Sequence, residues 1–222
     1  MGTKEPESRW TGRPLLTYTC DAARRSRELT RVVLSTDDEE ISEVGRRCSV
    51  EVPFRRPADL ARDDTPMLAV LQHAVRVLDE QERYQADIVV LLQPTSPLRR
   101  PEHIDATVRL LRQTGADSVV SVVEVPHQFN PMSVLRLEGD RLVPYAGGPT
   151  MTRRQDKPQV YARNGPAVLG VLRAVVMEQN SLYGTDCRPF VMSPEDSFDV
   201  DGAWDLELVE LVLARRAAAR QG

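Results

Sequence analysis

Short, almost wholly apolar runs alternate along this chain with longer stretches in which apolar residues recur every three or four positions. The runs at residues 31–35 and 87–92 predict buried strands, and the second is apolar on both faces, as central strands of parallel sheets are. Residues 118–123 predict a third strand. Shorter patterns at residues 50–53 and 168–172 indicate two more.

Helix signals lie between the predicted strands. Residues 36–41 begin with Thr-Asp-Asp followed by two glutamates, which predicts an N-cap and an acidic first turn at the positive end of the helix dipole. Pro66 and Pro101 open two longer amphipathic stretches, and residues 204–219 form the last. Because strands and helices alternate, we expect an α/β fold with a mostly parallel sheet covered on both sides.

The pattern changes between residues 127 and 158. Gly139 and Asp140 predict a hairpin turn between two short strands, at residues 134–137 and 141–144. The rest of this region is rich in glycine, proline and arginine. We therefore expect one domain over the whole chain, with this region as an insert on the sheet.

Composition limits the classes of function. The 222 residues carry 33 acidic and 29 basic side chains, for a net charge of −4, so a basic nucleic-acid-binding surface is not expected. The apolar runs are too short for a membrane span, and the first residues lack the apolar core of a signal peptide. Three cysteines without a Cys-x-x-Cys pair argue against a zinc site or a disulfide framework. These features predict a cytoplasmic protein without a nucleic-acid or membrane partner.

In α/β sheets of this type, ligands bind beyond the carboxyl ends of the strands. That rule selects the loops at residues 35–37, 93–100 and 197–201. The second loop is stiffened by two prolines and offers several hydrogen-bond donors to a polar ligand or phosphate. These donors are Gln93, Thr95, Ser96 and Arg99. The alternative for this loop is a rigid turn whose hydroxyls cap the next helix.

Two aspartates stand two residues apart in the third loop. Asp199 and Asp201 point the same way if the segment is extended, and paired carboxylates suit a Mg²⁺ ion that also contacts substrate phosphates. The alternative is that Asp201 caps a helix that begins near Ala203.

Two arginine pairs remain. Arg55 and Arg56 follow the strand at residues 50–53, and Arg153 and Arg154 lie in the insert. Guanidinium forks suit phosphates and carboxylates, whereas the alternative for both pairs is solvated surface charge.

Taken together and in order, eight segments resemble the acylneuraminate cytidylyltransferases, also called CMP-sialic acid synthetases, and the related CMP-legionaminate and CMP-pseudaminate synthetases. The matching segments are residues 12–16, 33–37, 51–57, 91–99, 117–122, 154–155, 161–165 and 199–201. The resemblance implies a Rossmann-like three-layer fold of the nucleotide-diphospho-sugar transferase type, with a small dimerisation insert.

The resemblance also implies a reaction. CTP and an acidic nine-carbon 2-keto sugar would give the CMP-sugar and pyrophosphate, as the anomeric hydroxyl attacks the α-phosphate. Asp199 and Asp201 would then hold Mg²⁺ as the catalytic pair, and Arg56 would line the cytidine-phosphate site. Thr95 and Ser96 would form the floor.

For the sugar, the resemblance assigns a hydrogen bond to Gln93 and places Tyr161 and Asn164 at the pocket. Arg154 would bind the sugar carboxylate across the interface of a homodimer paired through the insert. The family usually has arginine two residues before its Asn-Gly, where this chain has Ala162. This difference leaves open which nonulosonic acid is the substrate.

The family begins with a strand and a glycine-rich basic loop that cradles the triphosphate. Residues 1–11 do not supply this loop; Gly2-Thr3-Lys4 resembles part of it but lies too close to residues 12–14. We therefore expect the reading frame to extend upstream by one strand and loop, and the 222 residues alone to be poorly soluble or inactive. The alternatives are a non-catalytic homologue that binds a nucleotide, sugar or partner, and a same-fold enzyme for another nucleotide or a keto-sugar such as Kdo.

Overall fold

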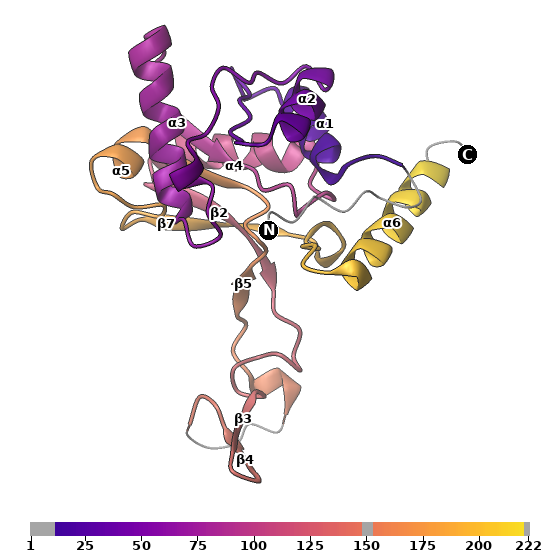
Figure 1. The fold of residues 1–222 in the computed structure, drawn as a ribbon. Helices are drawn as coiled ribbons and strands as arrows, with labels where there is room; N and C mark the ends of the chain where they lie inside the picture. Colours follow the sequence, from indigo (N-terminus) through magenta and orange to yellow (C-terminus); the bar gives the residue numbers. More distant parts are fainter. Residues whose placement is uncertain (1–11, 148–152, 220–222) are drawn as a thin grey trace.

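The computed structural model describes residues 12–147 and 153–219, an α/β arrangement of helices around one sheet with a separate hairpin (Figure 1). Its helices are α1 (Leu15–Arg25), α2 (Glu39–Arg47), α3 (Met67–Glu82), α4 (Pro101–Thr114), α5 (Arg173–Met177) and α6 (Ala203–Ala218), with 3₁₀ turns η1 (Ala58–Leu60), η2 (Arg154–Asp156) and η3 (Pro194–Asp196). Its strands are β1 (Ile88–Leu91), β2 (Ser118–Glu124), β3 (Leu135–Glu138), β4 (Arg141–Pro144), β5 (Tyr161–Arg163), β6 (Leu169–Leu172) and β7 (Cys187–Met192). The Gly2-Thr3-Lys4 segment lies outside the described residues.

Strand direction in the main sheet departs from the expected mostly parallel arrangement. The order is β1-β6-β2, with β7 on the other edge of β2 and β5 beside the end of β2. β1, β2 and β7 point the same way, but β6 is antiparallel to β1 and β2, and β5 is antiparallel to β2. The reason is the connection, because the chain returns from the insert through β5 to β6 without a crossover helix, and only an antiparallel partner can be joined in that way.

The three-layer arrangement is confirmed by the two faces of β1. Val90 packs with Ala22 of α1 and Ile104 of α4 on one face. Val89 packs with Leu71 of α3 and with α5 residues on the other. Successive side chains of a strand alternate between faces, so these two clusters are the two helical layers.

The helix starts follow the expected signals. The Asp38 carboxylate accepts a hydrogen bond from the Ile41 amide and caps α2, and prolines precede or open α3 and α4. The expected strands at residues 31–35 and 50–53 are reduced to one parallel bridge between Val33 and Glu51. Within the described residues, no helix is both long and apolar enough to span a membrane.

The insert carries the expected hairpin. β3 and β4 form their own two-stranded sheet, and Gly139 takes a left-handed conformation at the turn, with φ of 62°. In Figure 1 this hairpin lies at the far end of an arm that leaves the body along β2 and β5. Its side chains are largely exposed, including Leu135, Leu137 and Leu142. The body of the same chain therefore does not cover the apolar residues of the hairpin.

Candidate active site

The loop that follows β1 and the acidic segment before α6 are held against each other. The Val200 amide donates a hydrogen bond of 2.8 Å to the Thr95 carbonyl. The Ser96 hydroxyl donates one of 3.3 Å to Asp199 Oδ1. Two of the three loops selected from the sequence are therefore joined at the carboxyl end of β1.

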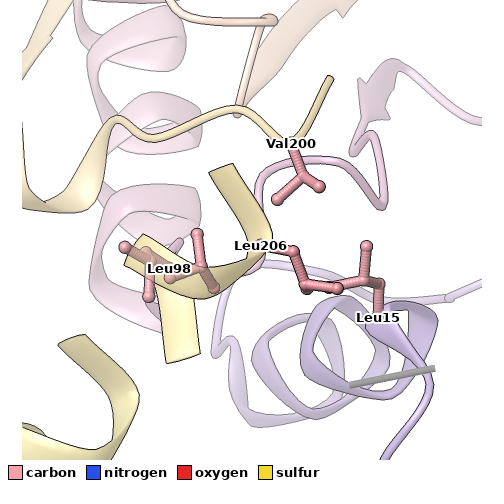
Figure 2. Close-up of a cluster of buried hydrophobic side chains, with 5 residues drawn as sticks. Leu15, Leu98, Val200 and Leu206 are labelled. Carbon is pink, nitrogen blue, oxygen red and sulfur yellow. The ribbon is translucent and has the colours of Figure 1, made fainter. Parts of the chain in front are cut away.

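A buried apolar cluster fixes the position of both loops (Figure 2). Val200, between the two aspartates, packs with Leu98 of the loop, Leu15 at the start of α1 and Leu206 of α6. Val200 is buried, whereas Asp199 is half-buried and Asp201 is exposed. The anchored Val200 therefore fixes the backbone between the two aspartates.

The helix-cap alternative for Asp201 does not match the contacts. Gly202 occupies the N-cap position of α6, and its amide donates to the Asp205 carboxylate at 2.9 Å. The Asp201 amide donates to the same carboxylate at 3.1 Å. Asp205 therefore closes the first turn of α6, and the Asp201 carboxylate is exposed.

The two carboxylates suit a Mg²⁺ ion that keeps most of its coordination for other groups. The described residues contain no group of three or more His, Cys, Asp or Glu side chains that could enclose a metal. Mg²⁺ is commonly held by one or two carboxylates, with water and substrate phosphates as its remaining ligands. Asp199 and Asp201 fit that description, whereas zinc, which needs three or four protein ligands, does not fit.

Asn164 and Gly165 support the site from behind. The Asn164 side chain is buried; its Oδ1 accepts from the Ser121 hydroxyl at 2.7 Å, and its Nδ2 donates to the Ser197 hydroxyl at 3.0 Å. A Cβ on Gly165, where φ is 114°, would lie 2.9 Å from Ser96 Oγ. Only glycine allows this close approach at residue 165. The side-chain oxygen and nitrogen of Asn164 are both hydrogen-bonded to other residues of the chain.

Arg56 lies on the neighbouring loop. Its amide donates to the Thr36 carbonyl at 2.9 Å, and its guanidinium donates to the Ser35 hydroxyl at 3.1 Å and to the Ser35 carbonyl. Partial burial lowers the pKa of Arg56, and the charge of Asp37 partly opposes this effect. A half-buried cation without a close carboxylate partner in the described structure can still receive an anion.

Arg56 and Gln93 both line a cavity of about 460 Å³. The remaining lining is largely apolar and includes Val32 and Leu34 of one chain segment and Val89 of β1. β1 is only half-buried, although it is apolar on both faces. Apolar side chains around Val32 and Val89 therefore border open space beside β1.

Arg154 and Tyr161 are not brought to this site within one chain. Arg154 begins η2 in the insert and is exposed, and Tyr161, at the start of β5, is also exposed. In Figure 1 the insert extends away from the loops that carry Gln93 and Asp199. The structure therefore joins the loop residues, the acidic pair and Asn164, whereas no hydrogen bond among the described residues links Arg154 of the insert or the side chain of Tyr161 of β5 to them.

Comparison with known proteins assigns the chain to a family. A family model described as cytidylyltransferase matches residues 8–176, which is more than half of the chain. The chain is a member of the cytidylyltransferase family. The CMP-N,N'-diacetyllegionaminic acid synthase of Legionella pneumophila is 29% identical over 203 residues, covering 91% of this chain and 86% of that protein.

Two further comparisons extend this assignment. The N-acylneuraminate cytidylyltransferase of Escherichia coli is 26% identical over 197 residues, covering 88% of this chain and 45% of that protein. A solved structure of CMP:2-keto-3-deoxy-manno-octonic acid synthetase in complex with CTP has a TM-score of 0.68 at 14% identity, covering 96% of this chain and 92% of that one. The structural likeness confirms the α/β cytidylyltransferase fold.

A buried carboxylate anchors the acidic segment of this cytidylyltransferase to α4 and α6. Asp196 contacts Arg100 at 2.6 Å, Arg216, the Ser193 hydroxyl at 2.9 Å and His103 Nε2 at 3.4 Å. Burial by itself raises the pKa of Asp196, but the Ser193 hydrogen bond and the charges of the basic side chains outweigh it and lower the pKa. Asp196 therefore stabilises the fold in its ionised form.

Asp196→Asn is expected to lower the free energy of unfolding by about 1–3 kcal/mol at pH 7, because charge-assisted hydrogen bonds are lost. The folded-state pKa is depressed, so the contribution is complete above the unfolded value of about 3.9 and is lost as pH falls through the folded pKa. Urea unfolding at pH 7 and pH 3 measures this dependence. Asp186→Asn, which breaks an exposed ion pair with Arg188, is the control and should lower the free energy of unfolding much less than Asp196→Asn does. An unchanged difference between wild type and Asp196→Asn at low pH would contradict the assignment.

Sequence reasoning missed the residues that join the loops. Ser121 and Ser197 link Asn164 to the sheet and to the acidic segment, and Gly165 permits the approach to Ser96. One signal was present, because Ser121 interrupts the valine run at residues 119–123, and a buried hydroxyl needs a partner.

Proposed function

We propose that this protein transfers CMP from CTP to a nonulosonic acid, giving a CMP-sugar and pyrophosphate. The observation that carries the proposal is the joined pair of loops, in which Thr95 and Ser96 hold Val200 and Asp199 at the carboxyl end of β1. Nucleotide ligands of such sheets bind at this edge. The chain belongs to the cytidylyltransferase family, which supports cytidine as the base.

The chain's own residues supply position and charge. Asp199 and Asp201 would hold Mg²⁺, which when bound supplies charge neutralisation on the triphosphate. The Ser96 hydroxyl keeps Asp199 in place, and the Thr95 carbonyl fixes the backbone between the two aspartates. Arg56 faces the shared cavity and would bind the phosphate of the nucleotide.

The sugar would bind at the start of the loop that follows β1. Gln93 follows β1 directly, lines the cavity and would donate a hydrogen bond to the sugar. Asn164 supports this side through Ser121 and Ser197. Two relatives are named for legionaminic and neuraminic acids, which supports an acidic nine-carbon sugar as the substrate.

A second copy of the chain would complete the site. The insert, residues 127–158, presents exposed leucines that the body of the same chain does not cover, and a two-stranded hairpin rarely stays folded alone. A homodimer through the insert would cover them and would bring Arg154 and Tyr161 to the partner's sugar pocket. Three free cysteines in the described residues support a cytoplasmic enzyme.

The test is pyrophosphate release by the purified protein. CTP with Mg²⁺ is offered together with N-acetylneuraminic, legionaminic or pseudaminic acid or Kdo, with UTP, ATP and GTP as matched nucleotide controls. Release is expected with CTP and a nine-carbon acid, and chelation of Mg²⁺ should stop it. Binding of CTP without release would favour the non-catalytic homologue, and release with Kdo alone would favour the same-fold alternative.

A further inference from the structure

Arg99 points into the protein, although the sequence grouped it with the possible ligand donors of the loop. The side chain is only 4% exposed. Its Nη2 donates to the Gln93 carbonyl at 2.6 Å and to the Thr19 hydroxyl of α1 at 2.9 Å. Its Nη1 donates to the same Gln93 carbonyl at 3.3 Å. This geometry leaves Arg99 no route to a ligand in the cavity.

Such a buried guanidinium is costly to keep. Burial lowers the pKa of Arg99 to about 9, although the charge of Asp199 partly opposes this effect. Its Nε has no hydrogen-bond partner, and no carboxylate in the described part of the chain forms an ion pair with it. A buried cation without an ion pair destabilises a fold relative to an apolar side chain of similar size. The buried Arg99 guanidinium therefore lowers the stability of the fold, which points to a role other than stabilisation.

The Gln93 carbonyl is where the guanidinium acts. The backbone bonds within this loop are long, at 3.4 Å from the Ser96 amide to the Gln93 carbonyl and 3.3 Å from the Arg99 amide to the Ser96 carbonyl. The two guanidinium bonds close the loop more firmly and connect its first residue to α1. Charge-assisted hydrogen bonds are about twice as strong as neutral ones.

We propose that Arg99 is a positioning residue for the sugar site: it fixes the backbone of Gln93, so that the Gln93 side chain meets the sugar, and touches no substrate itself. This inference rests on the proposed function. A lysine at this position would keep the charge but lacks the planar fork that sends two converging bonds to the Gln93 carbonyl and a third to Thr19. Arg99→Lys therefore removes the planar guanidinium and its hydrogen bonds but keeps the positive charge.

A double-mutant cycle in the full chain tests this. Arg99→Lys and Gln93→Ala should each raise the KM for the nonulosonic acid by about tenfold, with the KM for CTP within about twofold of wild type. Because Arg99 acts through Gln93, the double variant should be no worse than Gln93→Ala alone. Arg109→Lys, the same substitution at an exposed guanidinium of α4 paired with Glu28, is the control and should match wild type.

A second readout does not depend on activity. The exchange rate of the Ser96 amide, measured by NMR, should rise in Arg99→Lys, whereas amides of the β1–β6 ladder should keep their wild-type rates. Provided that the wild type is active, each of three results would overturn this inference and leave the proposed function intact. They are additive losses in the cycle, an equal rise in the KM for CTP, and a Ser96 exchange rate in Arg99→Lys that equals the wild-type rate. A wild type that releases no pyrophosphate with any sugar overturns the proposed function, and the inference falls with it.

Discussion

Asp201→Asn is expected to reduce pyrophosphate release by about 10²–10³-fold, because a preorganised group that stabilises charge in the transition state contributes about that much. The Asp201 carboxylate is exposed, and the first turn of α6 is closed by Asp205 instead. The substitution should therefore leave the thermal unfolding midpoint unchanged. Steady-state kinetics over a range of Mg²⁺ concentrations, with thermal unfolding of the same samples, measures both effects.

The matched control lies four residues further along. Asp205→Asn removes the same charge close by but keeps an oxygen that can accept the two backbone bonds of the α6 turn. Its activity should stay near wild type, since Asp205 is not expected to bind the metal. Equal losses of activity in Asp201→Asn and Asp205→Asn would indicate that the negative charge of this segment matters, and not a metal bound by Asp201. Retained activity in Asp201→Asn with an unchanged Mg²⁺ dependence would contradict the metal assignment.

Arg154→Ala is expected to be nearly inactive alone and to regain activity when mixed with inactive Asp201→Asn. Arg154 begins η2 in the insert, and Figure 1 shows the insert as an arm that extends from the body, so we expect a second copy to bring Arg154 to the site. Random pairing makes about half of the dimers mixed, and each mixed dimer has one intact site, so about a quarter of wild-type activity should return. Activity is measured after subunit exchange, and sedimentation of the wild type should show a homodimer.

Arg153→Ala is the matched control, because it removes the neighbouring guanidinium and should keep most of the activity. Leu137→Glu on the exposed hairpin should give a monomer by sedimentation, since a charge replaces apolar contact surface. If exchange between subunits is demonstrated and no activity returns, Arg154 acts within its own chain or has no role in the site.

Local signals predicted the elements whose ends are set by neighbouring residues. The Asp38 cap, the prolines before α3 and in α4, and the turn at Gly139 all act within a few residues of the ends they define. β7 was missed because Pro189 interrupts its pattern, yet a proline is tolerated on a strand such as β7, whose one described partner is β2. The predicted direction of β6 was wrong because the chain returns from the insert to β6 without a crossover helix.

The site was predictable as far as the choice of loops. The rule that ligands bind at carboxyl ends of strands selected both loops that Thr95 and Val200 join. The direction of each side chain was not predictable, because it depends on distant contacts. Arg99 turns inward toward Thr19, which is 80 positions away in the sequence, and the side-chain oxygen of Asn164 accepts a hydrogen bond from Ser121.

The apolar cluster of Figure 2 has a consequence for the working temperature of the protein. Val200 of the acidic segment is packed on Leu206 and Val209 of α6, and α6 packs on the rest of the chain through this same cluster. Heat that detaches α6 therefore also releases the backbone between the two aspartates, while β2 and β6 lie in other clusters of the core. On heating, we therefore expect activity to be lost together with the docking of α6.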